Sequence, residues 1–208
     1  MGELILIRHG ETEWSRSGQH TSHTDLPLTD LGERQARALV PVLAGRHIGL
    51  TLVSPLLRAR RTAELAGLLA PRITPDLHEW NYGAYEGVTT VEIRVTRPGW
   101  NLWTDGVALG PGANPGEDPA QVGARADRVL AEVRAAASRL GDTDIVLVAH
   151  SHFLRVLVAR YLGLTTASGA LFQLATGAVS RLGTEHGKPV VTALNVALPE
   201  SLYGVACA

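Results

Sequence analysis

The hydrophobic and polar positions of this chain divide into short apolar runs and longer segments with helical spacing. Residues 4–7 form a continuous apolar run, and residues 144–149 and 50–53 form two more with little polar interruption. Apolar runs without polar alternation are typical of strands that are buried on both faces, as in a parallel sheet. We therefore predict buried strands at residues 4–7 and 144–149 and a second short strand at residues 50–53.

Segments with helical periodicity lie between and after these runs. Apolar residues recur every three or four positions over residues 30–45, 56–69, 122–140 and 153–162. Thr29, or Asp30 together with Glu33, fits the start of the first helix, and Gly141 fits the end of the longest, whose arginines we place on faces other than the apolar one. Strands that alternate with helices predict an α/β fold, a three-layer α/β/α sandwich around a mostly parallel central sheet. Residues 171–198 alternate in short β-like pieces that would complete the sheet.

The segment between residues 80 and 120 is less regular. Residues 89–96 fit a short helix, whereas residues 106–119 are rich in glycine and proline. An irregular segment of this length is long for a compact domain, so we expect it to be a lid or a mobile surface excursion.

Length, composition and charge narrow the class of protein. A chain of 208 residues with 45% hydrophobic content is sized for a single domain spanning residues 1–208. A net charge of −1 without a basic stripe argues against nucleic acid or a membrane surface as a partner. No apolar run is long enough to cross a membrane, and the chain enters a strand at once, so we expect a cytoplasmic protein. A homodimer remains open.

Two of the predicted strands end in a histidine. His9 follows Arg8 at the end of the first strand, and His150 follows residues 144–149. Residues at the carboxyl end of such strands lie where α/β folds place ligands. A cation beside an imidazole suits an anionic substrate, and a helix that starts after His150 would direct its first N–H groups at the same place.

Four segments, in order along the chain, resemble the motifs of one family, the histidine phosphatase superfamily in its phosphoglycerate-mutase-like branch. Residues 8–15 (RHGETEWS) resemble its signature, and residues 54–63 (SPLLRARRTA) resemble S-P-L-x-R-A-x-x-T-A. Residues 77–87 (LHEWNYGAYEG) resemble L-x-E-x-x-x-G-x-x-E-G, and residues 150–155 (HSHFLR) resemble H-G-x-x-x-R with Ser151 in place of glycine. Residues 116–118 are close to G-E-S, with aspartate in place of serine. Residues 14–19 and 100–106 look like sedoheptulose-bisphosphatase-type members and bacterial acid phosphatases.

The resemblance implies a metal-independent phosphomonoesterase that works through a phosphohistidine and needs no cofactor. Its substrates would be small phosphate esters, such as sugar phosphates or bisphosphates. The implied catalytic residues are the nucleophile His9, the general acid Glu79, and the groups that meet phosphoryl charge, Arg8, Arg58 and His150. The implied substrate-binding residues are Ser15, Thr21, Ser22 and Ser151. Trp80 and Tyr82 flank Glu79 and would keep its carboxyl desolvated, as a general acid near neutral pH requires.

Three alternatives stay open beside this hypothesis. A cofactor-dependent phosphoglycerate mutase would share the catalytic pocket, but residues 85–119 are short, lack lysine and hold only Arg94 and Arg97, whereas mutases carry a basic insertion there. A metallohydrolase could use the histidines at 20, 23, 150 and 152, although acidic ligands are not clustered with them. A phosphosugar- or phosphopeptide-binding module would need only the cations, and the presence of His9 with Glu79 argues against it.

Overall fold

A six-stranded sheet forms the centre of the protein. The computed structural model describes residues 2–108, 114–199 and 201, and its sheet has the order β3-β2-β4-β1-β5-β6. The strands are β1 (Leu4–Arg8), β2 (Ile48–Val53), β3 (Arg72–Ile73), β4 (Asp144–Ala149), β5 (Val179–Glu185) and β6 (Lys188–Val196). The pairs β1–β4, β2–β4 and β2–β3 are parallel, and β5 and β6 form an antiparallel hairpin at the edge. The predicted α/β class and mostly parallel sheet are confirmed.

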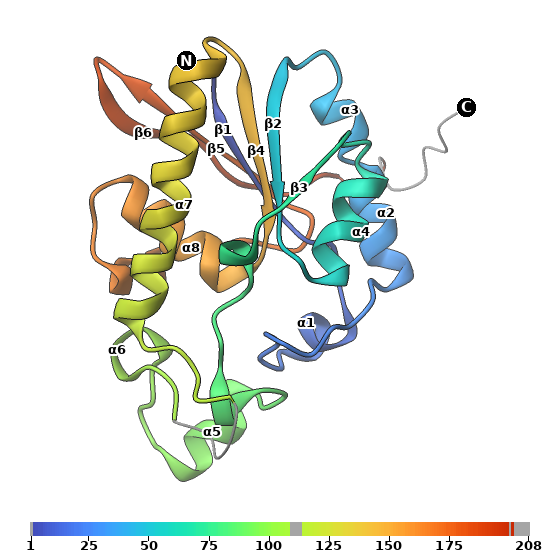
Figure 1. Ribbon diagram of the computed structural model, residues 1–208. Helices are drawn as coiled ribbons and strands as arrows, with labels where there is room; N and C mark the ends of the chain where they lie inside the picture. The colour runs from blue at the N-terminus through green and yellow to red at the C-terminus, as the bar shows by residue number, and fades with distance from the viewer. Residues whose placement is uncertain (1, 109–113, 200, 202–208) are drawn as a thin grey trace.

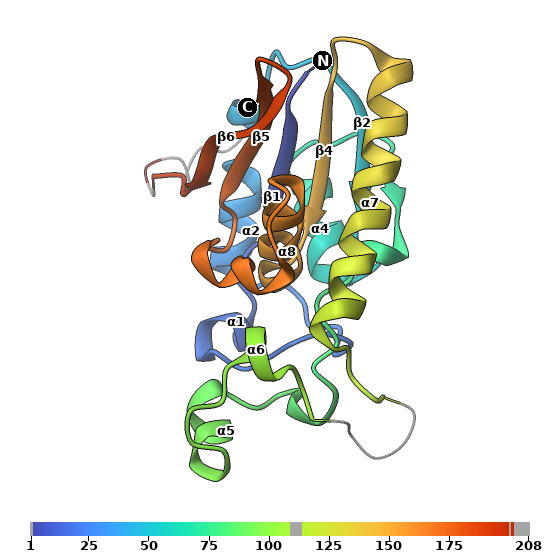
Figure 2. The same cartoon turned by 90° about the vertical axis from the view of Figure 1, so that its left-hand side faces the viewer.

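Helices cover both faces of this sheet. Helices α7 (Pro119–Leu140) and α8 (Ser151–Tyr161) lie on one face, and α2 (Asp30–Arg37), α3 (Val40–Leu43) and α4 (Leu57–Leu65) lie on the other (Figures 1 and 2). Strand β1 contributes to both cores because its side chains alternate: Leu4 and Leu6 pack toward α7 and α8, and Ile5 and Ile7 pack toward α2 to α4. These two buried layers explain why the run has no polar position.

The single helix predicted over residues 30–45 is wrong in one respect, because the segment forms two helices, α2 and α3. Pro41 lies in the first turn of α3. A proline has no N–H, and in the interior of one continuous helix its ring would collide with the carbonyl four residues earlier, so the helix breaks before it. The Thr29 side chain caps α2 by accepting the N–H of Gly32 at 3.1 Å.

The remaining elements are short. They are α1 (Glu13–Ser17), η1 (Pro75–Leu77), η2 (Gly83–Tyr85), α5 (Thr90–Thr96), α6 (Leu102–Asp105) and η3 (Thr166–Leu171). Figure 1 shows α1, α5 and α6 grouped below the carboxyl edge of the parallel strands. The lid predicted over residues 106–119 falls partly on residues 109–113, which lie outside the described residues. Within the described part of the chain, no helix is both long and apolar enough to cross a membrane.

Candidate active site

The carboxyl ends of three neighbouring strands bring the predicted residues together. In the registers of the sheet, Arg8 lies beside Ala149 and Val53 beside Val148. The ladder continues one residue further, because the N–H of His9 donates to the Ala149 carbonyl at 3.0 Å. His9, Ser54 and His150 therefore emerge at one edge, and the rings of His9 and His150 are 5.1 Å apart between centroids.

Gly10 is required by close packing. A Cβ atom at Gly10 would lie 2.3 Å from the carbonyl oxygen of Gly32 in the first turn of α2, and a Cβ at Gly32 would lie 2.2 Å from the carbonyl oxygen of Glu11. No side chain fits at either position, so these two glycines allow α2 to pack directly against the turn after His9. The sequence suggests a turn at Gly10, but the backbone contact is the stronger reason for the residue.

His9 is fixed in one tautomer. Its Nδ1 lies 2.7 Å from the carbonyl oxygen of Gly10, which can only accept, so Nδ1 carries the proton and donates it. Burial lowers the pKa of His9 well below its usual value near 6.5, and the charges of Arg58 and Arg8 lower that pKa further. His9 is therefore a neutral imidazole at physiological pH, and its Nε2 keeps the lone pair that a nucleophile needs.

His150 lies behind His9 and is tied to Arg58. The Nε–H of Arg58 donates to Nδ1 of His150 at 3.2 Å, so the proton of the neutral ring is on Nε2, which donates to the hydroxyl of Ser54 at 2.7 Å. Burial, followed by the charge of Arg58, lowers the pKa of His150 well below 6.5. The second strand-end histidine is thus neutral as well.

The two predicted arginines have different partners. Arg58 is fully buried and donates to the backbone carbonyls of Thr21, Ser22 and Thr24, so it holds the loop that follows α1. Arg8 donates through Nη1 to the carbonyl of Leu174 at 2.6 Å. Its Nε is buried and has no hydrogen-bond partner among the described residues. A buried N–H without an acceptor is costly, and a phosphate oxygen is a suitable acceptor for it.

Glu79 lies against the N-terminus of α8. One carboxylate oxygen accepts the N–H groups of Trp80 and Phe153, each at 2.8 Å, and the other accepts the N–H of His152 at 3.1 Å. The side chain is buried, and burial raises the pKa of Glu79 above its usual value near 4.5 although the three N–H groups and the charge of Arg58 oppose that rise. A carboxyl with a raised pKa at a cavity wall can donate a proton near neutral pH.

A cavity of about 180 Å³ opens between these groups. Most of the predicted site residues line it: Arg8, His9, Ser15, Thr21, Glu79 and Ser151. Arg58 and His150 lie directly behind this wall. Ser22 is placed differently, because its hydroxyl and its N–H both donate to the carboxylate of Glu86. Glu86 also accepts the N–H of Thr24, so it orders the loop that follows α1.

Three further side chains form one wall of the cavity. The hydroxyl of Tyr82 lies 2.6 Å from Nδ1 of His152, and the ring of His20 is 4.7 Å from the ring of Tyr82. Burial lowers the pKa of His152 and of His20 and raises the pKa of Tyr82, so all three groups are neutral. Sequence reasoning considered the two histidines only as metal ligands and Tyr82 only as a shield for Glu79.

The arrangement of histidine, cysteine, aspartate and glutamate side chains bears on the metallohydrolase alternative. Among the described residues, no group of three or more of these side chains is placed to hold a metal ion. The rings of His20 and His152 lie 6.2 Å apart and stack, and both have polar or aromatic partners within the protein. Metal independence itself stays a prediction.

Known proteins are similar to this chain in sequence and in fold. The profile of the histidine phosphatase superfamily (branch 1) matches residues 4–197. An acid phosphatase of Mycobacterium tuberculosis is 40% identical over 191 residues, which cover 88% of this chain and 87% of that protein. A sedoheptulose 1,7-bisphosphatase of Saccharomyces cerevisiae is 37% identical, with 77% and 67% covered. The solved structure of an open reading frame of Mycobacterium tuberculosis superposes with a TM-score of 0.86 at 37% identity and covers 94% of this chain and 98% of its own.

The match extends over nearly the whole sheet and the helices on both faces, and it includes all of the strand ends that form the cavity. Relatives in this family use a histidine as the nucleophile, as the resemblance implies. The chain belongs to the histidine phosphatase superfamily, branch 1.

Proposed function

We propose that this protein is a metal-independent phosphomonoesterase that hydrolyses small phosphorylated metabolites through a phosphohistidine on His9. The observation that carries the proposal is the state of His9. It is neutral, its Nδ1–H is held by the Gly10 carbonyl, and its ring lines a cavity that Arg8 also lines. This combination supplies a nucleophile and a cation at one cavity. The buried Nε–H of Arg8, which has no partner among the described residues, leaves that side chain with a donor to offer an anion.

The reaction would proceed in two steps. In the first, Nε2 of His9 attacks phosphorus, the P–O bond to the leaving alcohol breaks, and the carboxyl of Glu79 donates its proton to the departing oxygen. In the second, the Glu79 carboxylate takes a proton from water as that water attacks the phosphohistidine, which releases phosphate and restores both side chains. Phosphoryl charge would be met by Arg8, by the field of Arg58 and by the N-terminus of α8.

The wall formed by His20, Tyr82 and His152 favours an uncharged polar leaving group. Its three side chains are neutral hydrogen-bonding groups, and Arg8 is the one lysine or arginine side chain among the described residues that line the cavity. Hydroxyls of a sugar would find donors and acceptors there. A sugar phosphate therefore suits the cavity, with a bisphosphate as the second candidate because the yeast relative is named for one.

A cofactor-dependent phosphoglycerate mutase remains the alternative function. A mutase must keep its phosphohistidine away from water and must bind a second anionic group of the substrate. Incubation with 3-phosphoglycerate and catalytic 2,3-bisphosphoglycerate tests this alternative, and we expect little isomerisation compared with phosphate release from sugar phosphates. Phosphate release should persist after exhaustive chelation. Efficient isomerisation with little free phosphate would overturn the phosphatase proposal, and loss of activity on chelation with recovery on adding zinc would overturn metal independence.

A further inference from the structure

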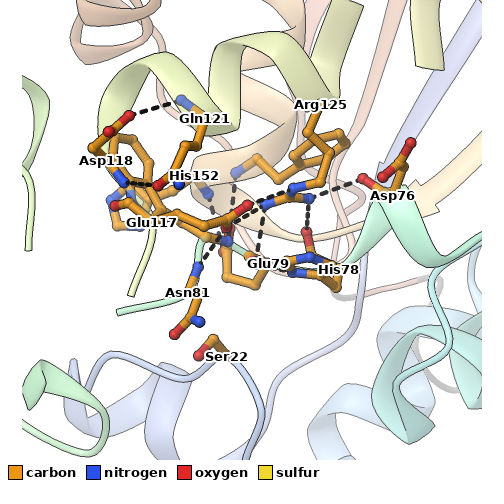
Figure 3. A network of polar contacts seen from close by, with 12 residues as sticks. Ser22, Asp76, His78, Glu79, Asn81, Glu117, Asp118, Gln121, Arg125 and His152 are labelled. Carbon is orange, nitrogen blue, oxygen red and sulfur yellow. Dashed lines mark hydrogen bonds and ion pairs between the residues drawn. The ribbon is translucent and has the colours of Figure 1, made fainter. Parts of the chain in front are cut away.

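The loop that carries Glu79 is held by one buried arginine of α7. Arg125 is 3% exposed, and every N–H of its guanidinium has an acceptor. Nε and Nη2 donate to the two carboxylate oxygens of Glu117 at 2.9 and 2.8 Å. Nη1 donates to the carbonyls of Asp76 and His78 at 2.8 and 2.6 Å, and Nη2 donates to the carbonyl of Glu79 at 3.3 Å. Figure 3 shows the guanidinium between the Glu117 side chain and the backbone of this loop.

Glu117 binds the other side of the same loop. Its N–H donates to the carbonyl of Asn81 at 2.9 Å, and its carboxylate accepts the N–H of Asn81 at 2.9 Å. The indole N–H of Trp80 donates to the carbonyl of Glu117 at 2.8 Å. The residues on both sides of Glu79 are therefore bound either to Arg125 or to its ion-pair partner.

Arg125 also contacts Phe153, the residue that binds one carboxylate oxygen of Glu79. The central carbon of its guanidinium lies 4.5 Å from the centroid of the Phe153 ring, and the N–H of Phe153 donates to the Glu79 carboxylate at 2.8 Å. One arginine thus contacts the backbone of Glu79 and the residue that binds its carboxyl group. Arg125 is not among the described residues that line the cavity.

We propose that Arg125 and Glu117 are positioning residues that fix the carboxyl of Glu79 at the N-terminus of α8 for proton transfer to the leaving group. The inference rests on the general-acid role of Glu79 in the proposed function. The inference also assigns roles to the segment at residues 116–118. Glu117 binds the loop that carries Glu79. Asp118 caps α7 by accepting the N–H of Gln121 at 2.8 Å, a role that aspartate fills as well as serine does.

The test compares Arg125→Gln with a matched control on the same helix. Arg128 lies one turn later and pairs with the carboxylate of Asp76, but it is solvent-exposed. We expect Arg125→Gln to lower kcat on a sugar phosphate by on the order of 10²-fold, the loss that a misplacement of about 1 Å can cause. Phosphorylation by p-nitrophenyl phosphate, whose leaving group needs little protonation, should fall much less, and Arg128→Gln should change neither rate.

A double variant distinguishes a positioning role of Arg125 from a general loss of active-site structure. If Arg125 acts through Glu79, the Arg125→Gln/Glu79→Gln protein should be no slower than Glu79→Gln alone. Two results would overturn the positioning role and leave the proposed function intact. The first is a double variant whose rate falls by the product of the two single-variant losses. The second is a folded Arg125→Gln protein whose rate falls equally on both substrates. If Glu79→Gln itself shows no dependence on the leaving group, the general-acid role fails and this inference fails with it. Should Arg125→Gln not fold, Glu117→Gln carries the same comparison.

Discussion

Replacing Glu79 by glutamine should remove proton donation and leave phosphoryl binding in place. The two side chains have the same shape, so the amide oxygen can still accept the N–H groups of Trp80 and Phe153. The amide nitrogen would face the N–H of His152, so that N–H would lose the carboxylate oxygen that accepts it in the wild-type protein. One unsatisfied buried donor costs about 1–3 kcal/mol, less than the roughly 5–15 kcal/mol by which a domain is usually stable. The variant should therefore fold.

The expected kinetic loss is much larger than this structural cost. General acid catalysis contributes about 10²–10⁴-fold, which corresponds to roughly 2.7–5.4 kcal/mol of activation free energy. The loss should be concentrated on alkyl and sugar phosphates, whose alkoxides are poor leaving groups. p-Nitrophenyl phosphate should lose far less in its phosphorylation step, because p-nitrophenolate departs without a proton.

Single-turnover measurement of both substrates is the appropriate assay, since it isolates the phosphorylation step from hydrolysis of the intermediate. The raised pKa of Glu79 adds a second check: for wild-type protein the rate on sugar phosphates should fall as pH rises through that pKa, and Glu79→Gln should lose this descending limb. Equal losses on the two substrates, with phosphorylation rate-limiting in both, would refute the assignment of Glu79 as the acid.

Two further predictions concern the histidines. His9→Ala should abolish turnover while the protein stays folded, and rapid acid quenching of wild-type protein should trap acid-labile phosphate on His9; phosphate on another residue would contradict this. Burial holds the pKa of His9, His150 and His152 below 6.5, so below that pH the unfolded chain binds more protons than the folded chain. The free energy of unfolding should therefore fall as the pH drops below 6.5. His152→Gln should make that slope shallower by up to about 1.4 kcal/mol per pH unit in urea denaturation, and an unchanged slope would show that His152 is not kept neutral.

Much of the fold could be predicted because burial on both faces leaves a plain pattern. Residues 4–7 of β1 and residues 145–149 of β4 have no polar position, since each of these residues meets a helix layer on one side of the sheet or the other. Strand β3 could not be found, because its two residues, Arg72 and Ile73, are both exposed and carry no periodicity. The break between α2 and α3 was visible in principle at Pro41, but the apolar spacing continues through it.

The candidate site was predicted where a motif placed a residue at a strand end or a helix start, as for His9 and Ser151. Arg125 was missed for a physical reason. Along α7 it looks like the other arginines, which we placed off the apolar face, and its burial depends on carbonyls of the Glu79 loop and on the carboxylate of Glu117. Contacts between segments that are distant in sequence leave no local signal. The same holds for Ser22, whose partner Glu86 lies 64 residues away.

The place of β1 in the sheet has a consequence for how the chain folds during synthesis. Strand β1 pairs only with β4 and β5 among the described strands, and the contact that anchors its start joins Glu3 to Asp144, 141 residues later. At ribosomal rates of about 5–20 residues per second, the apolar run at residues 4–7 would wait on the order of 10 s for its first strand partner. The predicted nucleophile therefore follows a strand that is made before both of its strand partners, and pairing between segments so distant in sequence favours slow folding. Chaperone dependence should consequently be governed by residues 4–7, far more than by the helices that form locally.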